Sequence, residues 1–211
     1  MKILVTGFDP FGQDKINPAL ETIKLLPKKI REHDIVTLEI PTAGFKSLEK
    51  IEKAIIEHNP DIVLSIGQAT GRYDITVEKV GINLDDYRIP DNLGQQFIDS
   101  KIFVDGPDAY IVELPVKKMI ENIKSKGIPA SMSMSAGTFV CNHVLYGVSH
   151  ILKTKFKDKK NGFIHIPCLP EQAINTRNIP SMSQETILKA IIASIEVIAD
   201  EEISVNGGKI C

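Results

Sequence analysis

The chain has 211 residues and a formal net charge of −2, with acidic and basic side chains interspersed along it. This length suits one ordinary domain, which buries about 70% of the surface of its unfolded chain. The lack of a basic patch argues against nucleic acid as a partner, and no apolar run is long enough to cross a bilayer.

Short apolar runs alternate with amphipathic segments from the first residues onward. Residues 3–6 predict a strand, and Asn17 followed by Pro18 is typical of a helix N-cap and first helical residue. Further along, the pattern predicts strands over 35–40, 61–66, 75–82 and 162–167. It also predicts a helix that stops at Asn59-Pro60, helices over 115–126 and 141–153, and a last helix carrying Ile187 to Ile198. Residues 83–110 are loop-like.

This alternation predicts an α/β fold in one domain, with a mostly parallel sheet that is covered by helices on both faces. In such folds the working residues lie beyond the carboxyl ends of the strands. We therefore expect Phe8, Phe11, Gln68 and the turn 165–168 to share one rim of the sheet.

Three cysteines, at positions 141, 168 and 211, make an odd count without a close C-x-x-C pair. This pattern argues against a disulfide scaffold and fits a reducing compartment. The first residues also lack a secretory signal pattern, so we expect a cytoplasmic protein. Cys211 is the last residue printed and is expected to be frayed.

The stretch from Ser133 to Asn142 is the most informative part of the chain. A turn rich in Ser, Ala and Gly delivers Cys141 to the start of a predicted helix. A thiol at that position is exposed to the positive end of the helix dipole, which lowers its pKa and favours the nucleophilic thiolate. The alternative is a buried cysteine that serves as a small apolar side chain.

A thiolate nucleophile needs a histidine to share its proton, and the chain has five. We interpret His33 and His58 as surface residues at polar helix ends. His143 and His150 lie on other faces of the helix that carries the cysteine. His165 alone ends an apolar strand, although a histidine at such a position, taken by itself, is more often a core residue that donates to a backbone carbonyl.

The second internal thiol, Cys168, makes an H-x-x-C spacing with His165, which suggests metal binding only weakly because further ligands are lacking. We expect no metal and interpret Cys168 as a wall residue beside the site.

A carboxylate must hold the histidine ring, and spacing alone leaves several candidates open. They are Glu78, Asp85, Asp86 and Asp91. Glu78 lies in the middle of an apolar strand, where an acidic side chain is unusual unless it is exposed or paired with another group.

Together these segments resemble the pyroglutamyl peptidase I (pyrrolidone-carboxylate peptidase) family of cysteine peptidases. The resemblance covers nearly the whole chain and rests on five motifs in the order of the family. They are residues 6–12 (TGFDPFG), 67–80 (GQATGR through ITVEKV), 88–92 (RIPDN), 135–142 (SAGTFVCN) and 165–172 (HIP with PEQ).

The resemblance implies one three-layer α/β/α catalytic domain over 1–211, of a phosphorylase/hydrolase-like architecture, without a cofactor and often in homotetramers. It implies removal of an N-terminal pyroglutamyl residue from peptides, with Cys141 as nucleophile, His165 as base and Glu78 as orienting acid. Arg88 matches a residue near the scissile carbonyl. The substrate-pocket positions match Phe8, Phe11, Thr42, Gln68, Ile89, Phe139 and Val140.

Three positions depart from the family pattern. Gly81 replaces an alanine, which we expect to loosen a strand position. Cys168 replaces an aromatic residue, and Met134 stands where a polar residue is more usual. None of them belongs to the implied triad.

Two other functions are open from the sequence. The architecture also resembles purine nucleoside phosphorylases, with residues 67–71 as a phosphate-binding turn, although this turn lacks the lysine and glycine pattern of known phosphate loops. A binding protein without catalytic activity is the other alternative. The loop-like segment 83–110 is compatible with a lid or with an assembly arm.

Overall fold

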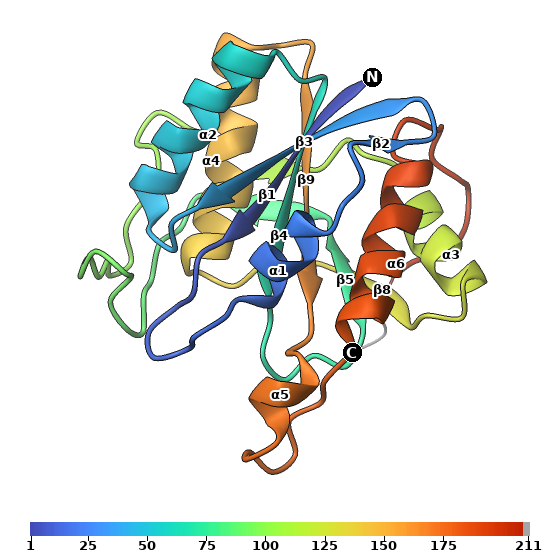
Figure 1. The fold of residues 1–211 in the computed structure, drawn as a ribbon. Coiled ribbons are helices and arrows are strands. Elements are labelled where there is room, and N and C mark those ends of the chain that lie inside the picture. The colour runs from blue at the N-terminus through green and yellow to red at the C-terminus, as the bar shows by residue number, and fades with distance from the viewer. Residues whose placement is uncertain (209–211) are drawn as a thin grey trace.

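A central sheet organises the structure, a computed structural model that describes residues 1–208 (Figure 1); Cys211 lies outside this range. The strands of this sheet are β1 (Lys2–Phe8), β2 (Lys29–Ile30), β3 (His33–Ile40), β4 (Ile62–Gln68), β5 (Ile75–Glu78), β8 (Ala130–Ser133) and β9 (Lys160–Ile166). Their spatial order is β2-β3-β1-β4-β9-β5-β8. Only the β2–β3 and β5–β9 pairs are antiparallel. The prediction of a mostly parallel sheet is confirmed.

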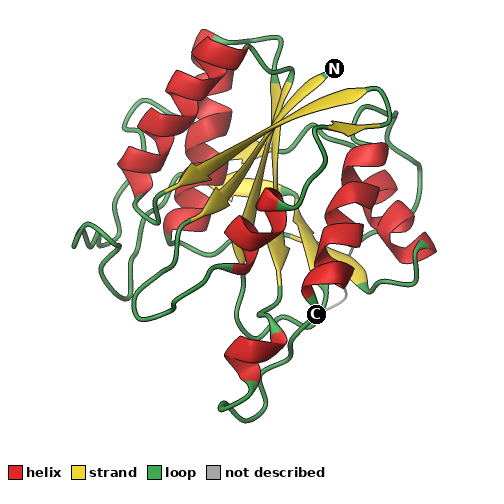
Figure 2. Ribbon diagram, viewed as in Figure 1, coloured by secondary structure: helices red, strands yellow, loops and turns green. Residues whose placement is uncertain are grey.

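Helices cover both faces of this sheet (Figures 1 and 2). They are α1 (Pro18–Lys24), α2 (Gly44–His58), α3 (Val116–Ser125), α4 (Val140–Lys155) and α6 (Gln184–Glu196). The short helix α5 (Pro170–Ala173) lies instead beyond the end of β9 (Figure 1). The helices α2 and α4 lie together on one face, whereas α1, α3 and α6 lie on the other. The predicted three-layer α/β/α architecture is therefore confirmed. Between residues 1 and 208, no helix is both long and apolar enough to span a membrane.

Local signals in the sequence explain most of the element boundaries. The Asn17 side chain accepts a hydrogen bond from the backbone N–H of Ala19 and so caps α1. Asn59 ends α2 with a left-handed backbone conformation at φ 46°. Residues 62–67 are all buried, as expected for a central strand that is covered on both faces.

The prediction of one strand over 75–82 is wrong, because the chain leaves the central sheet at Lys79. The N–H of Lys79 donates to the Ser133 carbonyl, and its own carbonyl accepts from Val112. Beyond it, β6 (Val80–Ile82) pairs with β7 (Ala109–Ile111) in a separate sheet. The apolar pattern continues through the break, so periodicity could not reveal it.

Gly81 brings β6 into close contact with α4. A Cβ atom at this position would lie 3.0 Å from the backbone nitrogen of Tyr146. The expectation that this glycine loosens a strand therefore misses its main effect, which is the close approach of two backbones.

Asn142 fixes the segment after β6 to the start of α4. This fully buried side chain accepts from the N–H of Ile82 and donates to the carbonyls of Ile82 and Leu84. Its single amide therefore satisfies three backbone groups that are shielded from water.

We expect Asn142→Ala to lower the free energy of unfolding by about 2–4 kcal/mol, because buried backbone groups lose their partners. Urea unfolding of the variant and the wild type measures the difference. Asn206→Ala is the matched control, because Asn206 is exposed. Equal stability of Asn142→Ala and the wild type would contradict the anchoring role.

Candidate active site

The strand register brings several polar side chains to one face of the sheet. His165 on β9 pairs with Gly67 on β4 and with Thr76 on β5. Directly paired residues point to the same face, and Glu78 lies two positions beyond Thr76 on its strand. His165, Thr76 and Glu78 therefore share a face. Gly67 lies on the same face and, because it has no side chain, leaves space there for another group.

The sulfur of Cys141 occupies the space above that glycine. Cys141 is the second residue of α4, and a Cβ at Gly67 would lie 3.1 Å from the sulfur and 2.8 Å from the Phe163 ring. A side chain at position 67 would thus fill the place of the sulfur. The helix start and the register of β4 with β9 together bring Cys141 to the face that carries His165.

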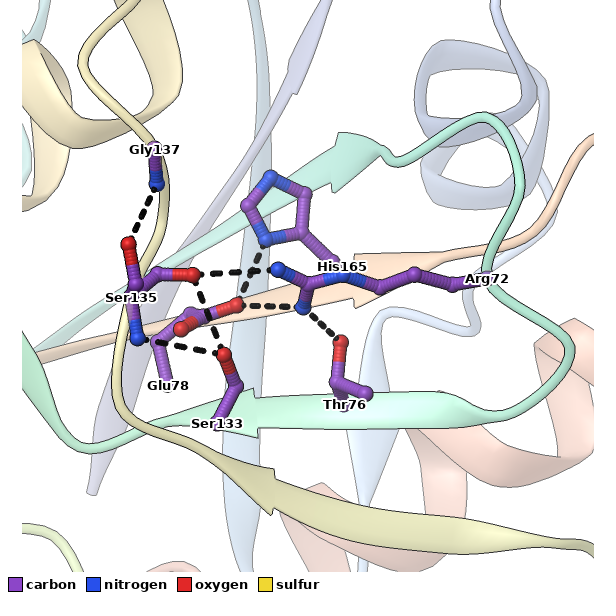
Figure 3. A network of polar contacts seen from close by, with 7 residues as sticks. All are labelled: Arg72, Thr76, Glu78, Ser133, Ser135, Gly137 and His165. Atoms are coloured by element: carbon purple, nitrogen blue, oxygen red, sulfur yellow. Dashed lines mark hydrogen bonds and ion pairs between the residues drawn. The ribbon is translucent and has the colours of Figure 1, made fainter. Parts of the chain in front are cut away.

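Glu78 and His165 form a short, buried hydrogen bond. The Nδ1 atom of His165 lies 2.7 Å from Oε1 of Glu78, and both side chains are buried (Figure 3). Since an ionised carboxylate only accepts, Nδ1 carries the proton and Nε2 is left as an acceptor. Within residues 1–208 the sulfur makes no hydrogen bond to this ring. Catalytic hydrogen bonds commonly tighten only when substrate is bound.

Burial and hydrogen bonding set the protonation of this pair. Burial alone raises the pKa of Glu78, but the hydrogen bond and charge of His165, together with Arg72, outweigh it and lower the pKa. Burial also lowers the pKa of His165, and this effect is stronger than the opposing influence of Glu78. The resting pair is therefore a carboxylate and a neutral imidazole.

The prediction that the helix start lowers the thiol pKa is wrong. Burial and, to a smaller extent, the negative charge of Glu78 raise the pKa of Cys141 to about 12, although Arg72 acts in the opposite direction. The cysteine thus rests as a thiol beside a neutral ring. This arrangement suits removal of the thiol proton by the histidine during attack, rather than a preformed thiolate.

A cleft of about 350 Å³ opens beside the cysteine. All seven residues expected to form a substrate pocket line it, together with Arg88 and Cys141. The complete lining is Phe8, Phe11, Asp14, Asn17, Thr42, Gln68, Thr70, Asp86, Arg88, Ile89, Thr138, Phe139, Val140 and Cys141. The Phe11 and Phe139 rings meet edge to face with their centroids 5.3 Å apart. The walls are therefore largely flat and apolar.

The structure separates the four candidate acids. Glu78 contacts His165, whereas Asp85 lies 2.6 Å from the Nδ1 atom of His143 in a second buried pair. Asp91 accepts from two backbone N–H groups of its own loop, and Asp86 lines the cleft. Of the four, Glu78 is the acid that holds the ring of His165.

One of the histidine predictions is wrong. His33 was expected at the surface, but it is only 2% exposed at the start of β3, where it pairs with Ile30. His58 is half-buried at the end of α2. His150 contacts the hydroxyl of Tyr110, away from the cleft. The sequence missed the burial of His33 because it did not predict the short strand β2.

Arg72, which had no role in the sequence analysis, and Cys168, which was expected as a wall residue, lie next to the site. Arg72 lies within an expected motif and donates to Glu78. Cys168 does not line the cleft itself but is buried behind it, where its sulfur contacts the lining residues Gln68 and Thr70. The sequence did hold one sign of its role, because Arg72 follows the expected pocket residue Gln68 by four positions and lies in the turn that leads to Glu78.

Comparisons with known proteins agree with this geometry. The model of the family described as "Pyroglutamyl peptidase" matches residues 1–201. The pyrrolidone-carboxylate peptidase of Fusobacterium nucleatum is 58% identical over 212 residues, which cover 100% of this chain and 99% of that protein. That of Finegoldia magna is 56% identical, covering 99% of each.

Solved structures give the same result. Pyroglutamyl peptidase I of Bacillus amyloliquefaciens superimposes with a TM-score of 0.92 at 43% identity, covering 96% of this chain and 99% of that chain. The pyrrolidone carboxyl peptidase of Thermococcus litoralis has a TM-score of 0.93 at 36% identity, covering 97% and 99%. The likeness therefore extends over the whole fold and is not confined to the motifs.

Gly67→Ala tests the contact between the sheet and the cysteine. The added methyl group would meet the Phe163 ring at 2.8 Å, so we expect the free energy of unfolding to fall by about 1–3 kcal/mol. Urea unfolding measures this change. Gly208→Ala is the control, since nothing lies within 4 Å of a Cβ there. Equal stability of both variants would show that the sulfur and ring are not held against Gly67.

Acid titration tests the buried neutral ring. Because burial lowers the pKa of His165 in the folded chain, the unfolded chain takes up this proton first, near its ordinary value of about 6.5. The contribution of the ring to stability is therefore complete above about pH 6.5 and is lost as the pH falls through the folded-state pKa.

We expect the free energy of unfolding, measured in urea from about pH 7.5 to about pH 5, to fall less steeply in His165→Gln than in the wild type. His58→Gln is the control, because His58 is half-buried and away from the cleft. Identical slopes for His165→Gln and the wild type would contradict a neutral buried ring.

Proposed function

The chain belongs to the pyroglutamyl peptidase family, and from this we propose that Cys141, His165 and Glu78 carry out its reaction. As a member of that family, it is a cysteine-type peptidase that removes an N-terminal pyroglutamyl residue from peptides. The single observation that supports the assignment of residues is their convergence on one face of the sheet, with the sulfur above Gly67 and the ring bonded to Glu78.

In the proposed first step, Nε2 of His165 takes the thiol proton while the sulfur of Cys141 attacks the pyroglutamyl carbonyl carbon. The imidazolium then gives this proton to the amine of the next residue, and the C–N bond breaks to leave a thioester. A water molecule, deprotonated by the same ring, hydrolyses the thioester and restores the thiol. Glu78 holds the ring through Nδ1 and stabilises its transient positive charge.

The start of α4 is suited to hold the oxyanion of the intermediate. Phe139 provides no side-chain cap, and the first helical hydrogen bond runs from the N–H of His143 to the carbonyl of Phe139. The N–H groups of the first turn, including that of Cys141, are therefore available to an anion. Arg88 lines the same cleft and adds positive charge near the carbonyl.

We assign the cleft to the pyroglutamyl ring, a neutral five-membered lactam. Phe8, Phe11 and Phe139 offer flat apolar walls, and Ile89 and Val140 extend them. Thr42 and Gln68 supply polar groups for the lactam edge. An ordinary N-terminus carries an ammonium group, and stripping its water in such a cleft is costly, so free amino termini are rejected.

The alternative functions have no support in the structure or its relatives. The turn 67–71, considered as a phosphate-binding loop, begins instead with the glycine beneath the sulfur. The relatives and solved structures described above are peptidases. A binding protein without activity does not agree with this family membership.

We further propose that residues 1–211 form one catalytic domain that assembles as a homotetramer in the cytoplasm. The family match over 1–201 and the continuous central sheet support one domain. Leu93, Ile98 and Val104 are 62%, 77% and 88% exposed, which suits an assembly surface on the segment 83–110. A catalytic thiol that must stay reduced suits a reducing compartment.

Hydrolysis of pyroglutamyl-p-nitroanilide tests the proposed roles. We expect Cys141→Ser to lose roughly 10³-fold or more in kcat, because a serine hydroxyl is far less acidic than a thiol. Glu78→Gln should lower kcat by roughly 10²-fold or more with little change in KM, because the amide favours the wrong ring tautomer. Iodoacetamide should abolish activity in the wild type.

Cys168→Ser is the matched control and should keep most of its activity, since this sulfur does not line the cleft. Near-normal turnover by Cys141→Ser would refute the nucleophile. A change of KM without a change of kcat in Glu78→Gln would refute the orienting acid. Turnover that requires phosphate would favour the phosphorylase.

A further inference from the structure

Arg72 connects three parts of the site that are distant in sequence. It lies in the turn between β4 and β5, with 29% of its side chain exposed. Its Nη1 atom donates to Oε1 of Glu78 at 2.7 Å and also to the hydroxyl of Thr76, and Nη2 donates to the carbonyl of Ser135 at 3.0 Å (Figure 3). Three of the five N–H groups of the guanidinium thus have a defined acceptor.

A single carboxylate oxygen of Glu78 accepts hydrogen bonds from both His165 and Arg72. Oε1 of Glu78 accepts from Nδ1 of His165 and from Nη1 of Arg72, both at 2.7 Å. Its other oxygen, Oε2, is buried without a hydrogen-bond partner in the part of the chain that the structure describes. Since Glu78 is fully buried, these two donors are needed to stabilise its negative charge.

The two donors differ in the permanence of their charge. The guanidinium of Arg72 stays protonated, whereas the ring of His165 is neutral at rest. The positive charge of Arg72 already compensates the negative charge of Glu78. The ring of His165 therefore does not need to be protonated to stabilise the carboxylate, and it can act as a base. The charged groups around the ring are Glu78 from β5, Arg72 from the turn after β4, and the ionisable thiol of Cys141 from α4.

The contact with Ser135 links this charge to the cysteine. The hydroxyl of Ser133 donates to the Ser135 carbonyl, and the hydroxyl of Ser135 accepts from the N–H of Gly137. This turn, drawn in Figure 3 from Ser133 to Gly137, precedes α4, whose second residue is Cys141. A displacement of Arg72 would therefore disturb the orienting acid and the turn before the nucleophile together.

We propose that Arg72 is a positioning residue of the reaction. It fixes Glu78 against His165 and anchors the turn that leads to Cys141. It does not line the cleft, so it acts through the other residues rather than on substrate. This inference rests on the proposed roles of Cys141, His165 and Glu78.

The test compares Arg72→Met, Arg72→Gln and Arg72→Lys with the wild type, using pyroglutamyl-p-nitroanilide over a range of pH. We expect kcat at neutral pH to fall roughly 10-fold to 100-fold in Arg72→Met, the effect of losing one charge-assisted hydrogen bond, while KM changes little. Without the guanidinium, the ring of His165 loses a neighbouring positive charge that opposes its protonation, so the acidic limb of kcat/KM should move to higher pH.

Alkylation of Cys141 by iodoacetamide, followed by mass spectrometry of its peptide, gives a readout that needs no turnover. Its pH midpoint should also move upward in Arg72→Met and Arg72→Gln, since a positive charge near the thiol is lost. Arg72→Lys keeps the charge and should restore most of the wild-type pH profile.

The proposal would be overturned if folded Arg72→Met and Arg72→Gln kept the wild-type dependence of kcat/KM on pH. This holds even if their kcat were lower, because a purely structural role leaves that pH dependence unchanged. If Arg72→Met does not unfold cooperatively, Arg72→Gln and Arg72→Lys decide the question. In a Glu78→Gln background, Arg72→Met should add little further loss, and full additivity would also contradict the proposal. Activity in Cys141→Ser would instead refute the underlying mechanism.

Discussion

The hydrogen bond from His165 to the buried carboxylate of Glu78 is the interaction around which the site is arranged. It exists because β5 runs antiparallel to β9 inside an otherwise parallel region, so that Thr76 pairs with His165 and Glu78 follows on the same face. A shift of this pairing by one residue would turn the carboxylate to the opposite face. The strand register thus determines the chemistry.

The electrostatic balance follows from that burial. Glu78 remains ionised because two donors share one of its oxygens, and the ring and thiol remain neutral because burial disfavours the charged form of each. A neutral pair avoids the cost of separated charges in the empty site. The charge forms only when the sulfur attacks, and at that moment the carboxylate stabilises the imidazolium while the start of α4 faces the oxyanion.

Much of the fold could be predicted from the sequence because its signals are local. Asn17 with Pro18 begins α1, Asn59 ends α2, and the apolar run of β4 is buried as its composition requires. The break at Lys79 could not be predicted, because it depends on hydrogen bonds to Ser133 and Val112 from distant segments. The raised thiol pKa was missed for a similar reason, since dipole and burial act in opposite directions and only the structure gives the burial.

The residues that follow the nucleophile explain how the cleft keeps its shape. Helical geometry directs Cys141 to the sheet, whereas Asn142 and His143 point toward the segment that begins at residue 82. Asn142 bonds the backbone of Ile82 and Leu84, and His143 bonds the buried Asp85. This segment continues directly into the cleft wall at positions 86, 88 and 89. The first turn of α4 therefore holds the nucleophile on one side and the substrate wall on the other, which ties the position of the sulfur to the shape of the pocket.

A lid that opened from residue 82 would have to break these buried contacts. The beginning of the 83–110 segment is thus a fixed wall, and backbone hydrogen bonds of Asp85 with Ser100 and of Tyr87 with Phe97 hold its later part against that wall.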